Sequence, residues 1–249
     1  CVLGVASAQT FPSKPIRFVT SQPGGGAAPA ARSIPSAIAG PLGQPAVVDN
    51  RATGVIPGEV VSKSPPDGYT LLIFGGTHWL QPFFRDNVPY DPIRDFLPIT
   101  IATTSPGILV VHPSLPVKSV KELIALAKAR PGDINYASGG TGSANHLAAE
   151  LFKAMAGVNL VQINYKGTGP AVSAVVSGEV QLMIPNATSV TPHIRSGRLK
   201  ALAVASAQPS ALAPGLATVT TSGLPGFESA SILGIFAPAK TPDAVITPK

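Results

Sequence analysis

The stretch NYASGGTGSANHLAAELFKAMAG, residues 135–157, decides the fold class, because it predicts a strand, a loop and a helix in that order. Tyr136-Ala137 belongs to a short apolar run of the kind that forms a buried strand. A glycine-rich loop follows, and Ser143 then predicts the N-cap of a helix that ends at Gly157. A strand that leads through a short loop into a helix is the building unit of an α/β fold.

The same alternation of apolar runs and helical segments recurs along the rest of the chain. The runs that predict strands are Ile16–Thr20, Thr70–Phe74, Gly107–Val111, Leu160–Asn164, Gln181–Ile184, Leu199–Ala205 and Ile232–Phe236. Runs that are apolar on both faces suit parallel strands with helices on either side. We therefore expect mostly parallel sheets flanked by helices.

Boundary signals predict further helices between these strands. Three of them are bracketed by Ser119–Glu122 and Pro131-Gly132, by Pro170 and Gly178, and by Thr191-Pro192 and Gly197. Near the beginning of the chain, Pro29 suits the first turn of a helix, whereas Pro35 is expected to kink it.

The composition excludes several classes of protein. The 249 residues are 45% hydrophobic and only 12% charged, and the formal net charge is +6. No run of about 18 apolar residues is present, so the sequence predicts no membrane-spanning helix. The basic residues are scattered rather than clustered on one face, which argues against nucleic-acid binding but is compatible with an attraction for small anions.

The first residues resemble the end of a signal peptide. An apolar run leads to Ala6-Ser-Ala8, an A-x-A cleavage pattern, so residues 1–8 are expected to be a remnant that directs the protein to the periplasm. Cys1, the only cysteine, could instead carry a lipid. The mature chain is expected to contain two domains, one formed by residues 9–104 and 224–249 and the other by residues 105–223.

Glycine-rich or hydroxyl-rich loops follow the predicted strands at the ends where an open α/β sheet binds its ligands. These loops are Ser21–Gly26, Gly75–His78, Ser138–Ser143, Tyr165–Gly169 and Pro185–Ser189. Glycine allows the backbone to approach a ligand closely, and the N–H groups at the start of a helix favour an anion. Each loop taken alone is compatible with a simple turn, but together they predict a cleft that binds an anion without a charged side chain.

No catalytic or metal-binding pattern accompanies these loops. Ser143 lies outside any G-x-S-x-G elbow, and the four histidines lack the spacing of a zinc site. No dinucleotide or phosphate-binding fingerprint is complete, so we expect neither an enzyme nor a cofactor or metal. Phe83-Phe84 is expected to lie in the core, whereas Trp79 could cover an organic ligand beside the cleft.

The chain resembles the Bug (TctC-like) family, the periplasmic solute-binding proteins of tripartite tricarboxylate transporters. The matching segments are Phe11–Arg17, Pro23–Gly26, Gly43–Pro45, Asp49–Arg51, Pro66–Leu71, Pro89–Pro92, Asp95-Phe96, Tyr136–Ser138, Gly142-Ser143, His146-Leu147, Tyr165–Gly167, Pro192–Ile194, Gly197–Val204 and Gly223–Gly226.

The resemblance implies a two-domain periplasmic binding protein, similar to type II, that closes on a small carboxylate like a flytrap. It also implies that the protein, as a monomer, delivers this ligand to the permease subunits in the membrane. Together with Trp79, the expected ligand-binding residues are Ser21, Gln22, Gly25, Gly26, Ala27, Ala28, Thr77, His78, Ser138, Gly139, Thr141, Gly142, Ser143, Tyr165 and Asn186.

Three features depart from the family pattern. Ala27-Ala28 replaces a Thr-Asp pair in a first loop that is one residue shorter, and the segment after Arg51 is also shorter. The chain stops at Lys249, where the family continues into further helices of the first domain. Two alternatives therefore remain beside transport: an anion-sensing protein that acts on a signalling partner, and a degraded paralogue that no longer binds.

Overall fold

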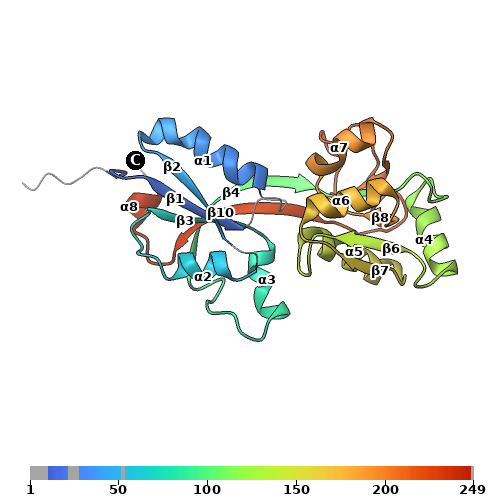
Figure 1. Ribbon diagram of the computed structural model, residues 1–249, viewed down its shortest axis with the longest axis horizontal. Helices are drawn as coiled ribbons and strands as arrows, with labels where there is room; N and C mark the ends of the chain where they lie inside the picture. The colour runs from blue at the N-terminus through green and yellow to red at the C-terminus, as the bar shows by residue number, and fades with distance from the viewer. Residues whose placement is uncertain (1–10, 22–27, 52–53, 248–249) are drawn as a thin grey trace, which may run out of the picture.

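The computed structural model describes residues 11–21, 28–51 and 54–247, which form two α/β domains, each built on one sheet (Figure 1). The signal-peptide remnant and four predicted site residues, Gln22, Gly25, Gly26 and Ala27, lie outside these ranges. Among the described residues, no helix is both long and apolar enough to cross a membrane.

The first sheet has the strand order β2-β1-β3-β10-β4 and the second has the order β7-β6-β8-β5-β9. The strands are β1 (Ile16–Ser21), β2 (Ala46–Arg51), β3 (Thr70–Gly75), β4 (Phe96–Pro106), β5 (Ile108–Val111), β6 (Asn135–Ser138), β7 (Val161–Asn164), β8 (Leu182–Met183), β9 (Lys200–Val204) and β10 (Ala230–Pro238). The helices are α1 (Ala28–Leu42), α2 (Ile56–Ser62), α3 (Thr77–Phe84), α4 (Val120–Ala129), α5 (Ala144–Ala156), α6 (Thr168–Ser177), α7 (Ala187–Arg195) and α8 (Asp243–Ile246).

Each sheet is mostly parallel, as expected, because four of its five strands run in the same direction and one runs against them. β1 pairs in parallel with β2 and β3, but β10 is antiparallel to both β3 and β4. In the second sheet β6 is parallel to β7 and β8, whereas β5 is antiparallel to β8 and β9. In the first sheet β10 is antiparallel to β4 because β4 leads toward the second domain and β10 returns from it (Figure 1).

The chain passes between the domains on strands rather than on loops. Ala102–Pro106, which the sequence suggests as a crossover, is the end of β4, and β5 of the second sheet begins at Ile108. Ser222–Gly226 lies in turns that precede β10. The first sheet therefore takes strands from residues 16–106 and 230–238, and the second from residues 108–204. Domain borders at residues 104 and 224 remain a prediction.

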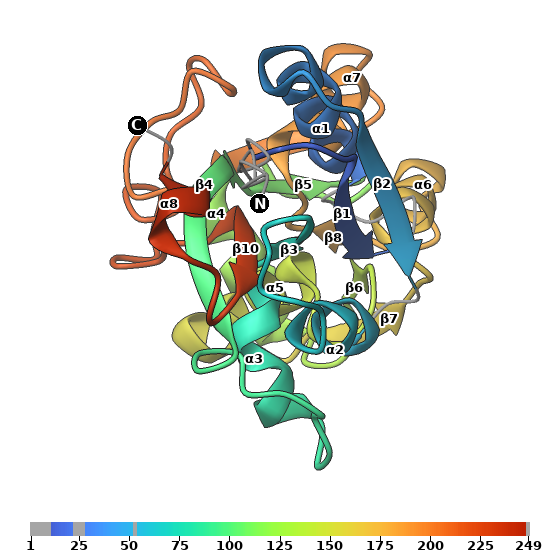
Figure 2. The ribbon, with the colours of Figure 1, turned by 90° about the vertical axis from the view of Figure 1, so that its left-hand side faces the viewer.

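Helices cover both faces of each sheet and bury its central strands, as the apolar runs predict. In the first domain α1 covers one face with Ala31 against Phe18 and Ile73, while α2 and α3 cover the other (Figure 2). In the second domain α4 and α5 cover one face, where Phe152 packs beside Tyr136, and α6 and α7 cover the other. Burial of this apolar surface, at roughly 25 cal/mol per Å², is the main stabilising contribution.

The predicted caps are confirmed for three helices. Ser119 accepts a hydrogen bond from the Glu122 N–H at the start of α4, and Ser143 does the same for the His146 N–H at the start of α5. Gly157 and Gly178 end α5 and α6 in the left-handed conformation, with φ of 60° and 82°.

One helical expectation is wrong. The sequence places Thr191-Pro192 at the start of a helix, but α7 begins at Ala187 and contains both residues. β8 is only two residues long, so the helix begins earlier in the chain than expected. Pro192 has no N–H group, so one hydrogen bond within α7 is missing. α1 contains Pro35 and continues to Leu42, and the expected kink at Pro35 stays a prediction.

Candidate functional site

Three helices of the second domain, α5, α6 and α7, begin directly after the parallel strands β6, β7 and β8. Their N-termini therefore share one edge of the second sheet. The first N–H groups of a helix have no partner within it and carry a partial positive charge. This edge is consequently suited to an anion, as the loop pattern predicts.

Hydrogen bonds with side chains of β7 and α5 hold the loop Ser138–Ser143 in place. Ser138, at the end of β6, is completely buried; its Oγ donates to Asn164 Oδ1 at 3.2 Å and accepts from Gln162 Nε2 at 2.7 Å. The Gly139 N–H donates to Asn145 Oδ1 at 2.9 Å, and the Gly142 N–H donates to His146 Nδ1 at 3.1 Å. The first residues of α5 thus fix the loop that precedes them.

Several N–H donors on this edge remain available for a ligand. Among the described residues, no acceptor pairs with the N–H groups of Gly140, Thr141 and Ala144, or with those of Thr168 and Gly169 at the start of α6. Thr141 is exposed, so its hydroxyl adds a further donor at the surface. Neither the Ser138–Ser143 loop nor Thr168–Gly169 contributes a charged side chain.

His146 lies near a group of polar side chains formed by Tyr136, Glu150 and Lys153. The Glu150 carboxylate accepts from the Tyr136 hydroxyl at 2.5 Å and from Lys153 Nζ at 2.7 Å. Burial lowers the pKa of His146, and Lys153 lowers it further, against the opposing effect of Glu150. His146 therefore stays neutral at pH 7, and its Nδ1 can accept the Gly142 N–H.

The same group of side chains determines the pKa of Glu150. Burial by itself would raise the pKa of this carboxyl, but the hydrogen bonds from Lys153 and Tyr136 outweigh burial and lower it. Burial raises the pKa of Tyr136, and the hydrogen bond to the ionised Glu150 raises it further. Tyr136 therefore stays protonated and donates to Glu150, while the neutral His146 accepts from the Gly142 N–H.

The first domain brings fewer of the predicted residues to this edge. Ser21 ends β1 and is half-buried, and the described part of the chain resumes with Ala28 at the start of α1. Thr77 begins α3 and is half-buried. Trp79 is half-buried as well and, with Phe74 and Phe236, lines an apolar hollow of about 410 Å³.

His78 differs from the expectation that it contacts a ligand. Its side chain is 0% exposed, its Nε2 has no hydrogen-bond partner among the described residues, and burial lowers its pKa to about 4. Its ring stacks on that of Tyr90 with 5.1 Å between centroids. Four further rings lie within 6.0 Å of it: Phe74, Trp79, Phe96 and Phe236. The His78 side chain is thus part of an aromatic core.

The expectation that Phe83-Phe84 lies in the core is wrong. Phe83 is 81% exposed and Phe84 is 39% exposed, because α3 buries His78 and Gln81 instead. The Phe84 ring reaches across to the second domain, where a Cβ added to Gly142 would lie 3.2 Å from it. The residue pattern of α3 did not reveal this contact between the domains.

Tyr165 and Asn186 lie beside the site, but their side chains have other surroundings. The Tyr165 N–H donates to the Ser138 carbonyl at 2.9 Å, whereas its hydroxyl donates to Glu179, beyond the far end of α6. Burial and Glu179 raise the pKa of Tyr165 to about 12. Asn186 precedes α7, forms an isolated β-bridge with Gly107, which links β4 to β5, and makes no side-chain cap.

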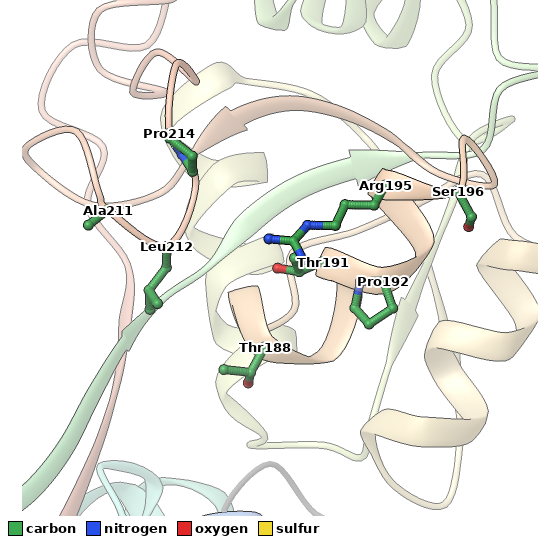
Figure 3. A pocket seen from close by; sticks show the side chains of 8 residues that line it. All are labelled: Thr188, Thr191, Pro192, Arg195, Ser196, Ala211, Leu212 and Pro214. Carbon is green, nitrogen blue, oxygen red and sulfur yellow. The ribbon is translucent and has the colours of Figure 1, made fainter.

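A second hollow, of about 780 Å³, lies on the outer face of α7 and contains none of the predicted ligand-binding residues (Figure 3). Arg195 and Thr191 project from α7 toward Leu212 on the facing loop. In the ranges that the structure describes, no three His, Cys, Asp or Glu side chains are grouped as a metal site would require.

Two α/β domains, joined by paired strands and carrying helix N-termini at one sheet edge, define the class of two-domain binding proteins. Residues 30–248 match the model of the tripartite tricarboxylate transporter family receptor, named TctC, and the chain belongs to this family. Over 245 residues it is 38% identical to protein BugT of Bordetella pertussis, covering 96% of this chain and 75% of BugT.

Solved structures of the same fold have carboxylates in their names. One, an R. palustris protein with adipate, is 34% identical to this chain with a TM-score of 0.85, covering 95% of this chain and 80% of that protein. Another, MatC from Rhodopseudomonas palustris with bound malate, is 29% identical with a TM-score of 0.85, covering 95% and 82%. The family and these neighbours are binding proteins, not enzymes.

Proposed function

We propose that the protein is a periplasmic receptor that captures a small carboxylate between its domains and delivers it to the permease of a tripartite tricarboxylate transporter. The observation that carries the proposal is the pair of adjoining helix N-termini, α5 and α6, whose first N–H groups have no acceptor among the described residues. The adipate and malate of the neighbouring structures support the class of ligand.

The ligand would be bound without a permanent ion pair. The Ser138–Ser143 loop supplies backbone N–H groups and hydroxyls, and the first domain supplies Ser21–Ala28. Dipoles of this kind stabilise an anion less than a bidentate arginine does. Reversible capture and release are what a receptor that delivers its ligand requires.

Domain closure would complete the site. β4 and β10 pair over the segment that joins the domains, so bending of this pair would bring the two loops together. The described residues of the Ser138–Ser143 loop already approach the first domain through Phe84. We propose that the mature protein is a monomer, exported through a cleaved signal peptide, in which each domain contributes one loop to the ligand.

A thermal-shift screen with mono-, di- and tricarboxylic acids tests the proposal. Binding to the folded state raises the melting temperature in proportion to RT ln(1 + [L]/Kd). We expect at least one acid to raise it at millimolar concentration, and Gly142→Asp to abolish that rise through its charge and its bulk. Absence of any rise in the wild-type protein would favour a paralogue that has lost binding.

A matched control is available at Gly215. Gly142 and Gly215 have nearly the same φ, 77° and 78°, but no atom lies within 4 Å of a Cβ at Gly215, on the loop after β9. Gly215→Asp therefore imposes the same backbone strain and the same charge on a loop that contributes no residue to the proposed site. It should leave the ligand-induced shift intact, and an equal loss in both variants would place the ligand elsewhere.

A further inference from the structure

Asn145, which is not among the expected ligand-binding residues, joins the two helix N-termini of the candidate site. Its side chain is 5% exposed and lies in the first turn of α5. We propose that Asn145 is the positioning residue that holds the start of α6 against the loop before α5, and thereby sets the spacing of the N–H groups that bind the carboxylate. This inference rests on the proposed function.

The hydrogen bonds define the orientation of the Asn145 amide. Its Oδ1 accepts from the Gly139 N–H at 2.9 Å and from Ser143 Oγ at 2.6 Å. A backbone N–H can only donate, so the oxygen must face Gly139 and the amide nitrogen must face the other way. There Nδ2 donates to Thr168 Oγ1 at 3.3 Å, on the first residue of α6.

The backbones that Asn145 connects are already in contact. A Cβ added to Gly139 would lie 2.9 Å from the Gly167 carbonyl carbon and 2.9 Å from the Thr168 nitrogen. Gly139 therefore allows the two loops to approach closely, but it provides no polar bond between them. Among the described residues, the bond from Asn145 to Thr168 is the hydrogen bond that joins the first turn of α5 to that of α6.

Aspartate has the same length and shape as asparagine. It would retain both acceptor bonds, its second oxygen could accept from the Thr168 hydroxyl, and its charge is favourable near a helix N-terminus. Its negative charge would also lie beside the proposed carboxylate. Asn145→Asp should thus preserve the fold while it prevents anion binding, a combination that a purely structural role of Asn145 does not predict.

Thr168→Val removes the bond from the other side at nearly constant volume. Loss of a hydrogen bond is typically equivalent to about a three- to tenfold change in an equilibrium constant. We expect the Kd for malate or adipate to rise by this factor. We also expect the amides of residues 171–173, the first hydrogen-bonded amides of α6, to exchange faster with deuterium in the absence of ligand. Thr191→Val, in α7, is the control, because the Thr191 hydroxyl donates within its own helix, to Ala187 O at 2.8 Å.

The experiment combines hydrogen exchange without ligand with calorimetric titration of malate and adipate into the wild-type protein, Asn145→Asp, Thr168→Val and Thr191→Val. The proposal predicts faster exchange in Thr168→Val only, weaker binding in Thr168→Val, and loss of binding with an unchanged melting temperature in Asn145→Asp. Unchanged exchange at residues 171–173 in Thr168→Val, or tight binding by Asn145→Asp, would overturn it. A wild-type protein that binds neither acid contradicts the proposed function. In that case the hydrogen exchange of the ligand-free variants still tests whether Asn145 positions the start of α6.

Discussion

The ring of Phe84 lies against Gly142 across the gap between the domains, with its Cδ2 3.2 Å from the place where a Gly142 Cβ would be. Phe84 belongs to the last turn of α3 in the first domain, and Gly142 to the loop before α5 in the second. Gly142 also has a φ of 77°, which residues with a side chain rarely adopt. Two independent constraints therefore require glycine at this position.

Gly142→Ala should reduce the free energy of unfolding by more than its backbone conformation explains. The left-handed conformation alone costs about 1–2 kcal/mol for alanine, and the new methyl group would also press on the Phe84 ring. Gly215→Ala carries the same backbone cost without a neighbour within 4 Å. Urea denaturation of both variants should show the larger loss for Gly142→Ala.

The contribution of the ring is isolated by a second pair of variants. In a Phe84→Ala background, the methyl group of Gly142→Ala meets no ring, so its cost should fall to that of Gly215→Ala. If Phe84→Ala leaves the cost of Gly142→Ala unchanged, the two side chains do not interact in solution and the domains are further apart than described.

The N-cap serines of α4 and α5 allow the loss of stability to be distinguished from the loss of ligand binding. Ser119 and Ser143 each accept a backbone N–H at the start of a helix, but only Ser143 also donates to Asn145, at 2.6 Å. Replacement of either serine by alanine should cost about 1 kcal/mol of stability. Only Ser143→Ala should weaken the binding of malate or adipate, because only this cap lies in the candidate site.

The measurement is a urea titration of each variant and a calorimetric titration with the acid that the thermal-shift screen identifies. Ser119 thus serves as the control for the stability loss itself. Equal affinity in Ser143→Ala and Ser119→Ala would show that the N-terminus of α5 does not contact the ligand.

Local signals in the sequence predicted much of the fold. Ser119, Ser143, Gly157 and Gly178 mark helix ends through interactions with their immediate neighbours, so their roles could be read without knowledge of the rest of the chain. Buried strands such as β3 and β5 were found for the same reason, since their apolar runs are continuous. By contrast, β4 is largely exposed at the edge of its sheet and contains Pro98, so no apolar run marked it.

The candidate site was predicted less completely, because its contacts join distant residues. Asn145 and Thr168 are separated by 23 positions, and no spacing rule connects them. His78 follows a glycine-rich loop at a strand end, which suggested a ligand contact. Its burial depends on Tyr90, Phe96 and Phe236, which only the folded chain brings around it.

The buried His78 should make the protein less stable in acid. Burial lowers its pKa in the folded state to about 4, from 6.5 for the unfolded chain, so the unfolded state binds more protons between these values. The free energy of unfolding therefore falls as the pH drops below about 6.5, by about 2 kcal/mol at pH 5 and about 3 kcal/mol below pH 4. His146, whose pKa is also lowered, contributes in the same direction.

His78→Phe tests this contribution, because phenylalanine fits an aromatic core and cannot bind a proton. Urea denaturation of the wild-type protein and the variant at pH 8, 7, 6 and 5 gives the pH dependence of each, independently of any difference in their absolute stability. Between pH 8 and pH 7 the two should change nearly in parallel, since His78 is mostly neutral in both states. Below pH 6.5 the wild-type protein should lose stability more steeply than His78→Phe. Parallel curves down to pH 5 would mean that His78 is accessible to protons, and hence to a ligand, in the folded protein.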